Sequence, residues 1–241
     1  MEWKIGCSGY HYPEWKGTFY PDGVAQRKWF EYYSTRFNTL ELNVTYYKFP
    51  RVEAIHRWYE RSPAGFSFTV KAPRHITHYK KFREAQRMIN DFNTAIKEGL
   101  KDKLGCVLFQ FPSNFRFESD RLLRIIDMLD PSIRNVLEFR HESWWTPAVY
   151  EVLMRANVMF SGMSHPSLPD QVIATTDTLY YRFHGVPHLY NSLYEIQKLE
   201  QVVQDIVSSG AKNAYIYFNN TAAGHAITNA KQLHDISELV H

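Results

Sequence analysis

Two glutamates and three basic side chains stand near the ends of short, apolar, β-prone runs. The carboxylates are Glu41 and Glu138, and the cations are Lys71, Arg140 and Arg182. Three cations around two central anions favour a bound anion over a bound metal ion, and guanidinium and ammonium groups suit phosphate. We therefore expect Lys71, Arg140 and Arg182 to hold a phosphate group.

Proton transfer in such a site would fall to Glu41, Glu138 and His184, which are the candidate catalytic residues. Burial and the surrounding cations would adjust the pKa of the carboxyl groups, and His184 would be a second acid or base. Two carboxylates on nonadjacent strands also suit a glycosidase. A purely structural network, with Glu41 paired to Lys71 and Glu138 to Arg140, is the alternative for each residue.

Further amides and rings complete the candidate ligand-binding set. Besides the three cations we expect it to contain Asn43, Gln110, Asn219, Asn220, Tyr10, Tyr46 and Trp144. Residues 219–224 lead directly into the last expected helix, where free backbone N–H groups bind phosphate in many barrels, although Asn220 could simply cap that helix. Rings beside cations suit a nucleotide or nucleic acid, whose bases stack while its phosphates meet charge.

Metal-ligand residue types are also present, without a decisive pattern. His75 and His78 flank two residues of a loop, and a His-x-x-His pair is not a sufficient ligand set. The nearby guanidinium groups would repel a divalent cation. We expect no metal and no cofactor, and we expect Cys7 and Cys106, which lie in apolar runs, to be buried free thiols.

The elements that must position these residues alternate between strand and helix along the whole chain. The expected strands are residues 3–7, 39–43, 67–71, 106–110, 136–140, 158–161, 180–183 and 215–218. The expected helices are residues 25–37, 52–61, 85–100, 119–129, 147–156, 194–209 and 225–239. This pattern predicts an α/β fold, a single (β/α)8 TIM-type barrel over residues 1–241, irregular between strands 6 and 7, with functional groups where the strands end.

The composition permits such a core and excludes other classes. Hydrophobic residues make up 44% and charged residues 22%, which argues against a disordered or fibrous chain. A net charge of +3 is too small for a polybasic protein. Without a leader-type N-terminus or an apolar run of ~18 residues, we expect a soluble, cytoplasmic protein with no membrane association, and we predict no protein partner.

The sequence resembles a known family across nearly its whole length. The stretches that carry the resemblance are residues 5–10, 15–21, 40–47, 68–71, 76–78, 108–112, 138–144, 181–185 and 217–221. They are similar to the YecE-like family, domain of unknown function 72. The resemblance implies a TIM-type barrel and little about chemistry. Its members look in outline like barrel nucleases of the endonuclease IV kind, but this chain lacks the dense His, Asp and Glu set of a three-zinc site.

The leading hypothesis is a metal-independent enzyme, a hydrolase or lyase, that acts on a phosphate-bearing small molecule or on nucleic acid. A non-catalytic module that binds nucleic acid or a phosphorylated metabolite is the first alternative. A sugar-active hydrolase that uses the two glutamates is the second.

Overall fold

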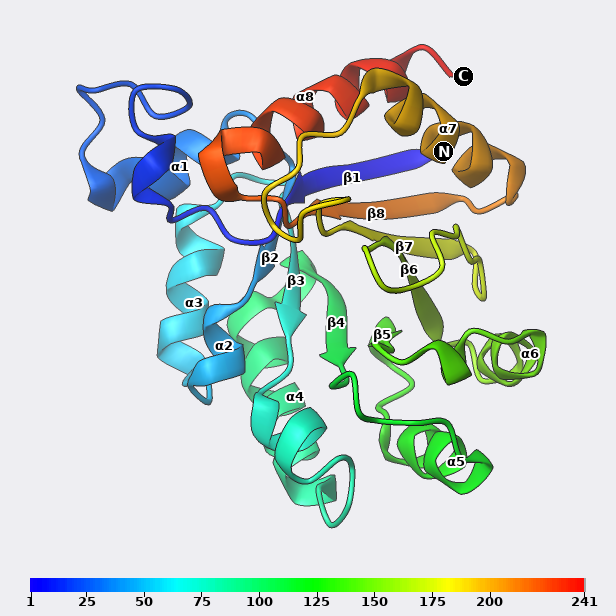
Figure 1. Cartoon of the computed structure of the whole chain (residues 1–241). Coiled ribbons are helices and arrows are strands. Elements are labelled where there is room, and N and C mark those ends of the chain that lie inside the picture. The colour runs from blue at the N-terminus through cyan, green and yellow to red at the C-terminus, as the bar shows by residue number, and fades with distance from the viewer. Residues whose placement is uncertain (241) are drawn as a thin grey trace.

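The computed structural model describes residues 1–240, which form a nearly closed barrel of eight parallel strands (Figure 1). The strands are β1 (Glu2–Cys7), β2 (Thr39–Leu42), β3 (Ser67–Lys71), β4 (Leu104–Gln110), β5 (Asn135–Glu138), β6 (Met159–Ser164), β7 (Thr178–Phe183) and β8 (Asn213–Phe218). Their hydrogen-bonded order is β1-β8-β7-β6-β5-β4-β3-β2. The predicted α/β barrel of the TIM type is confirmed.

Helices carry the chain back from the end of one strand to the start of the next (Figure 1). They are α1 (Trp29–Ser34), α2 (Val44–Tyr47), α3 (Val52–Arg61), α4 (Gln86–Leu100), α5 (Ser119–Met128), α6 (Pro147–Arg155), α7 (Ile196–Ser208) and α8 (His225–Glu238). In the part of the chain that the structure describes, no helix joins β6 to β7, so the predicted irregularity is confirmed. None of the helices described is long and apolar enough to cross a membrane.

Alternate residues of each strand fill the inside of the barrel, because successive side chains of a strand point to opposite faces. Near the middle, the Tyr217 hydroxyl lies 2.6 Å from the Oγ1 atom of Thr39 and 2.9 Å from that of Thr69. Two residues farther along the same strands come Glu41 and Lys71. The alternation therefore places these two charged side chains directly above a layer of tyrosine and threonine.

The barrel closes at a short seam between β1 and β2. β1 pairs with β8 over six residues but meets β2 at a single bridge, between Ser8 and Glu41. Next to this bridge, the hydroxyl of Tyr33 accepts a hydrogen bond from the Cys7 N–H at 2.7 Å and donates one to the Thr39 carbonyl at 3.0 Å. A tyrosine side chain thus stands in for a backbone hydrogen bond between the two strands.

Several short elements differ from the sequence prediction. The segment expected as one helix over residues 25–37 is a 3-10 turn, Gln26–Lys28, followed by the short helix α1. Helix α2 and a π-helical turn, His75–Tyr79, stand where loops were expected. Contacts between elements support such short pieces, as where Thr45 in α2 donates a hydrogen bond to the Lys71 carbonyl at 2.6 Å.

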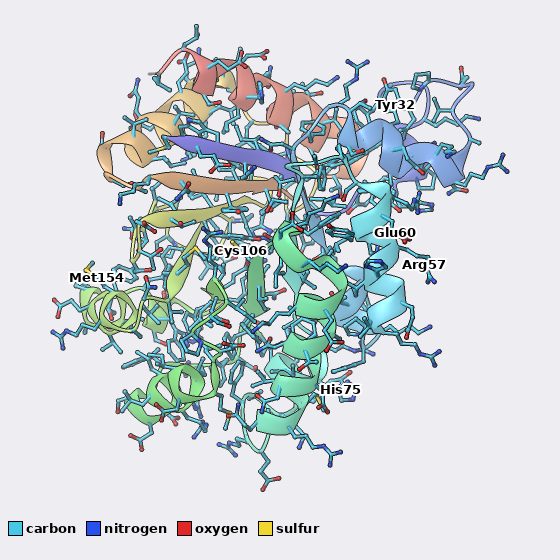
Figure 2. All side chains as sticks on the ribbon, turned by 180° about the vertical axis from the view of Figure 1, so that it is seen from behind. Tyr32, Arg57, Glu60, His75, Cys106 and Met154 are labelled. Atoms are coloured by element: carbon cyan, nitrogen blue, oxygen red, sulfur yellow. The ribbon has the colours of Figure 1, made fainter. Side chains whose placement is uncertain are left out.

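Both cysteines are buried free thiols, as predicted. Figure 2 shows Cys106 among the strands in the middle of the molecule, whereas Met154 projects outward from α6.

Candidate anion site at the C-terminal ends of the strands

Arg182, near the end of β7, joins the two candidate carboxylates. Its Nη2 donates to Glu41 Oε1 at 2.6 Å, and its Nη1 donates to Glu138 Oε2 at 2.6 Å. All three side chains are 1% exposed or less. Because both terminal nitrogens already bind carboxylates, Arg182 neutralises buried charge and does not present a free guanidinium to a ligand.

Both carboxylate oxygens of Glu41 are hydrogen-bonded. Oε1 also accepts from the Ser8 hydroxyl, and Oε2 accepts from the Tyr180 hydroxyl at 2.7 Å. The Ser8 hydroxyl in turn accepts from the Asn43 side-chain amide at 2.7 Å. This network spans three strands and fixes the carboxylate, as a buried charge requires.

Glu138 binds a second cation, Arg140, through the Nε atom of that side chain. Burial raises the pKa of Glu138, but the charges of Arg140, Arg182 and Lys71 outweigh burial and lower this pKa to about 2. Glu138 is therefore ionised at neutral pH, and its basicity is too low for an efficient proton acceptor there.

His184 is fully buried between Arg140 and Asn219. Arg140 Nη2 lies 3.1 Å from Nε2 of the ring, and the Asn219 side-chain amide lies 3.0 Å from Nδ1. Burial, followed by the charges of Arg140 and Arg182, holds the pKa of His184 well below its usual value. Since arginine only donates, Nε2 is the acceptor and the neutral ring carries its proton on Nδ1. The Asn219 Nδ2 atom faces this proton, and an amide turned by 180° would present its oxygen instead.

The structure therefore brings Glu41, Glu138 and His184 together, but each of the three is 0% exposed. A general acid or base must come within hydrogen-bond reach of the substrate. In this conformation the three predicted proton carriers lie beneath the accessible surface of the site and form its buried floor. Other groups form the accessible surface.

Lys71 is the cation of the site that makes no ion pair among the described residues. Its side chain is half-buried at the end of β3, and its Nζ lies 4.4 Å from the centroid of the Tyr46 ring. Within residues 1–240, no carboxylate oxygen lies within 4.0 Å of this nitrogen, since Glu41 and Glu138 pair with the two arginines. Burial and the neighbouring Arg182 lower the pKa of Lys71 to about 8, although Glu138 and Glu41 oppose them.

Other partly exposed groups of the predicted set also follow strands at this end of the barrel. They are Asn43, Gln110, Arg140 and Asn219, with the Tyr46 ring beside them. The Arg140 side chain is 10% exposed, and the Oδ1 atom of Asn43 is buried without a hydrogen-bond partner among the described residues. These groups offer donors and acceptors for a polar ligand.

Two histidines that were not predicted at the site lie close to it: His78, weighed only as a metal-ligand type, and His165, not considered. His78 Nε2 lies 3.1 Å from the Tyr46 hydroxyl, and burial followed by the charge of Lys71 lowers the pKa of His78 to about 4. The ring of His165 lies 5.7 Å from that of His184, and burial followed by the charge of Arg140 lowers its pKa to about 4. Both follow strands, in segments whose course the sequence pattern did not predict.

Three predicted ligand-binding residues lie elsewhere. Trp144 is 0% exposed and stacks on Phe139 with ring centroids 3.8 Å apart, so it offers no face to a ligand. Asn220 is also buried, and its amide donates to the Ser192 carbonyl at 2.8 Å. The ring of Tyr10 packs edge-on against Trp58, outside the group of charges. These side chains stabilise the loops around the site.

The loop 219–224 is less open to phosphate than predicted. The Asn219 N–H donates to the Phe183 carbonyl at 2.7 Å, and the Ala222 N–H donates to the Tyr190 carbonyl at 3.2 Å. Both amides are thus used within the protein. The start of α8 therefore offers fewer free backbone amides than the sequence suggests.

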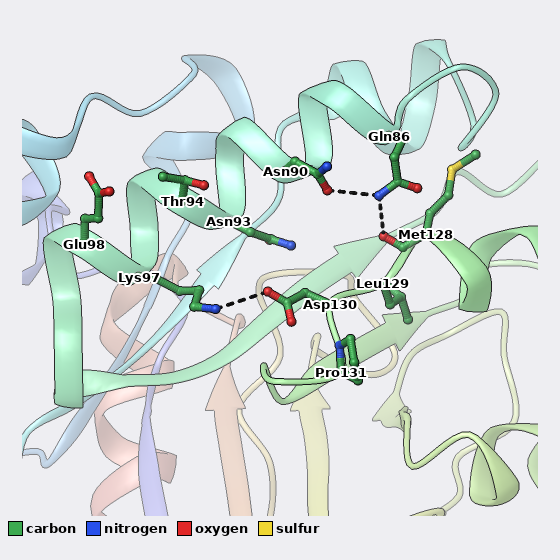
Figure 3. Close-up of a pocket in the computed structure, with 10 residues that line it drawn as sticks. All are labelled: Gln86, Asn90, Asn93, Thr94, Lys97, Glu98, Met128, Leu129, Asp130 and Pro131. Carbon is green, nitrogen blue, oxygen red and sulfur yellow. Dashed lines mark hydrogen bonds and ion pairs between the residues drawn. The ribbon is translucent and has the colours of Figure 1, made fainter.

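Other parts of the described chain offer less chemistry. A hollow of about 420 Å³ lies on the outer side of the barrel, between α4 and the α5–β5 connection (Figure 3). Its polar side chains largely bind within the protein: Gln86 bonds to Asn90 and to a backbone carbonyl, and Lys97 pairs with Asp130 at 3.2 Å (Figure 3). Within residues 1–240, no three His, Cys, Asp or Glu side chains gather so that they could hold a metal ion.

Comparison with known proteins identifies relatives that are similar in sequence. The chain is 27% identical to the UPF0759 protein YunF of Bacillus subtilis, over 92% of this chain and 91% of that protein. It is 25% identical to the UPF0759 protein YecE of Escherichia coli K12, over 70% of this chain and 60% of that protein.

Two crystal structures of similar proteins share the architecture. A DUF72 family protein of Thermotoga maritima, 29% identical, superposes with a TM-score of 0.89 over 99% of this chain and 100% of that one. One from Enterococcus faecalis, 18% identical, has the same fold, with a TM-score of 0.84 over 99% and 96% of the two chains. The family described as "Protein of unknown function DUF72" matches residues 4–240, and the chain belongs to this family.

Proposed function

We propose that the C-terminal face of the barrel binds a phosphate group of a nucleotide or nucleic acid, with Lys71 and Arg140 as its cationic ligands. The observation that carries this proposal is the charge balance of the site. Three cations, Lys71, Arg140 and Arg182, stand against the two carboxylates of Glu41 and Glu138. One positive charge is left over, and it belongs to Lys71, the cation without a carboxylate partner among residues 1–240. A half-buried ammonium in that position favours an anionic ligand.

Arg140 supports the same role with its remaining nitrogen. Its Nε binds Glu138 and its Nη2 faces His184, whereas no described residue accepts a hydrogen bond from Nη1. The amides of Asn43, Gln110 and Asn219 supply neutral donors nearby. Arg182 was expected to bind phosphate. In the structure it binds the carboxylates of Glu41 and Glu138 and fixes their positions beneath the site.

A cationic groove beside the site favours nucleic acid over an isolated phosphate. It has a volume of about 460 Å³ and is lined by residues of α2, α3 and the turn between them. Lys48, Arg51 and Arg57 line it, are exposed, and make no ion pair within residues 1–240; Figure 2 shows Arg57 projecting from α3. The rings of Phe49 and Trp58 also line it. Cations that follow a backbone, together with rings on which bases stack, are typical of single-strand binding.

Helix α2 contributes residues both to the groove and to the surroundings of Lys71. Thr45 lines the groove and also donates its hydroxyl to the Lys71 carbonyl at 2.6 Å. Tyr46, the next residue, places its ring against the Lys71 ammonium. A single nucleic acid strand could then place one phosphate beside Lys71 and further phosphates along α3.

The sugar-active alternative has less support. A glycosidase needs two carboxyl groups that flank its substrate. Glu41 and Glu138 are both buried and both bound to Arg182. Two classes of function remain compatible with the site. One is an enzyme that uses the accessible groups of Lys71, Tyr46 and His78, and the other is a module that binds its ligand without turnover.

Binding of a fluorescein-labelled single-stranded oligonucleotide, followed by anisotropy, tests the proposal. Lys71→Gln should weaken binding at least tenfold, whereas Lys212→Gln, a lysine just before the start of β8, should leave it unchanged. With about three phosphates neutralised, raising the salt from 50 to 200 mM should weaken binding about 20-fold. Equal affinity of the wild type and Lys71→Gln, or binding that ignores salt, would contradict the proposal.

A further inference from the structure

We propose that Lys71 is an amine nucleophile that forms an imine with the carbonyl carbon of a phosphate-bearing aldehyde or ketone. The inference rests on the proposed function, because the phosphate would be held by the same site. Its geometrical basis is the position of the amine, at the end of a barrel strand, half-buried and without a carboxylate partner among residues 1–240.

The surroundings of Lys71 favour the neutral amine that a nucleophile must be. Its Nζ is largely removed from solvent and lies near the positive charges of Arg182 and Arg140, and the carboxylates that could hold it protonated bind those arginines instead. A pKa of about 8 leaves about a tenth of the amine neutral at pH 7, whereas an ordinary lysine is neutral in fewer than about one molecule in a thousand. Lysines placed beside a second cation are activated in this way.

A pair of proton-transfer groups lies beside the amine. The Tyr46 hydroxyl is 3.1 Å from His78 Nε2, and the other ring nitrogen of His78 is 2.9 Å from the Thr77 hydroxyl. His78 is neutral at pH 7, with a pKa of about 4, so Nε2 accepts from Tyr46 while Nδ1–H donates to Thr77. The Tyr46 hydroxyl therefore donates to His78, while the Tyr46 ring packs against Lys71.

Imine formation balances with the groups at hand. The Nζ lone pair attacks the carbonyl carbon, the C=O π electrons move to oxygen, and that oxygen takes a proton to give a carbinolamine. Proton loss from nitrogen and protonation of the hydroxyl then release water and leave a C=N bond. Tyr46 and His78 relay these protons. The amine and carbonyl give imine and water, with no oxidant or reductant, and the protonated imine keeps the positive charge that the phosphate needs.

The carbonyl could come from a free phosphorylated sugar or from a base-free deoxyribose within a nucleic acid strand, whose ring-opened form is an aldehyde. Both present an aldehyde or ketone close to a phosphate. The half-buried amine of Lys71, with the positive charge of Arg140 close to it, suits this combination.

Reductive trapping tests the inference. The full chain is treated with sodium cyanoborohydride and either glyceraldehyde 3-phosphate or an oligonucleotide that contains one base-free site, and the modified lysine is located by peptide mass spectrometry. Lys71 should be labelled at least tenfold faster than any other lysine and at least tenfold faster by the phosphorylated aldehyde than by glyceraldehyde. Labelling should rise with pH to a half-maximum near 8, and inorganic phosphate should slow it.

Two variants separate chemistry from charge. Lys71→Arg keeps a cation but cannot form the imine, so it should lose the adduct and retain oligonucleotide binding. Tyr46→Phe keeps the ring against Lys71 and removes the proton relay, so it should slow labelling several-fold while phosphate still competes.

The outcomes distinguish this inference from the proposed function. If phosphate and oligonucleotides bind but neither aldehyde labels Lys71 preferentially, the inference is overturned and the binding site stands. If Lys71 is labelled equally by both glyceraldehydes and phosphate does not compete, the imine stands and the phosphate site is overturned. Preferential labelling by one phosphorylated probe supports the inference and identifies the source of the carbonyl.

Discussion

Replacing Arg182 by methionine should destabilise the fold by about 3 to 5 kcal/mol at neutral pH, the usual result of removing one partner from a buried ion pair. Methionine approximates the length of the side chain but leaves the carboxylates of Glu41 and Glu138, both 0% exposed, without the guanidinium that they share. Domains of this kind have a free energy of unfolding of about 5 to 15 kcal/mol, so the loss is a large fraction of the total.

The pH dependence of stability gives a second, independent test of the role of Arg182. In the wild type, the folded-state pKa of Glu138 is about 2, below its ordinary value of 4.5. Glu138 therefore contributes stability that is fully present above pH 4.5 and is lost as the pH falls from 4.5 to 2, in total about 3 kcal/mol. Without Arg182 the pKa of Glu138 rises. Lowering the pH from 7 to 5 should therefore reduce the difference in free energy of unfolding between the variant and the wild type.

Urea unfolding followed by far-UV circular dichroism at pH 7 and pH 5 measures both effects. Arg155→Met is the matched control, because Arg155 lies on α6 with a side chain 79% exposed and pairs with Glu151 at 3.6 Å. That exposed pair should contribute less than about 0.5 kcal/mol. A loss below about 1 kcal/mol in Arg182→Met, or a difference that widens toward pH 5, would refute the reasoning.

Three further predictions concern the seam and the accessible side of the site. Tyr33→Phe should lower the free energy of unfolding by about 1 to 3 kcal/mol, because it removes the hydroxyl between β1 and the Thr39 carbonyl; unchanged urea unfolding would contradict this role. Gly6→Ala should also destabilise the seam, since a Cβ there would lie 2.3 Å from the same carbonyl oxygen, and a fully stable variant would show that the strands can separate without loss. By NMR, His78 should titrate at about pH 4. Burial and then the charge of Lys71 lower this pKa, so Lys71→Met, which removes the charge, should raise it, and a titration near 6.5 in the wild type would contradict the described contacts.

The barrel follows from the sequence because alternating strand and helix segments leave few other topologies. Helices with a clear 3.6-residue pattern, such as the expected 119–129, match the structure within one residue. The short helix α2 and the turn His75–Tyr79 could not be predicted in the same way. Four or five residues carry too little periodicity, and contacts such as Thr45 with the Lys71 carbonyl hold them.

The charged residues of the site could be identified from the sequence, but their pairing could not. Pairing depends on how deep each side chain lies in the barrel, which strand register and tilt determine. The alternative pairing of Glu138 with Arg140 is present in the structure, whereas Glu41 pairs with Arg182 rather than with Lys71. This exchange is what leaves the lysine accessible.

Aromatic residues were the hardest to assign. A tryptophan after a strand can stack on a ligand or on the protein, and the sequence pattern around Trp144 does not distinguish the two. The structure does, because one face of Trp144 covers Phe139 and its N–H donates to the Phe115 carbonyl at 2.6 Å. Tyr46 has the same ambiguity in sequence, and its packing against Lys71 brings it to the site.

The unequal pairing of β1 also has a consequence for how the protein is made. On the ribosome the first strand emerges long before the last one, yet it pairs along its length with β8 and touches β2 at one bridge. β1 can therefore take its place only after about two hundred more residues have been synthesised, which makes ring closure a late, high-contact-order event. Because Ser8 follows β1 directly and binds Glu41, the polar floor of the site is completed in that same step.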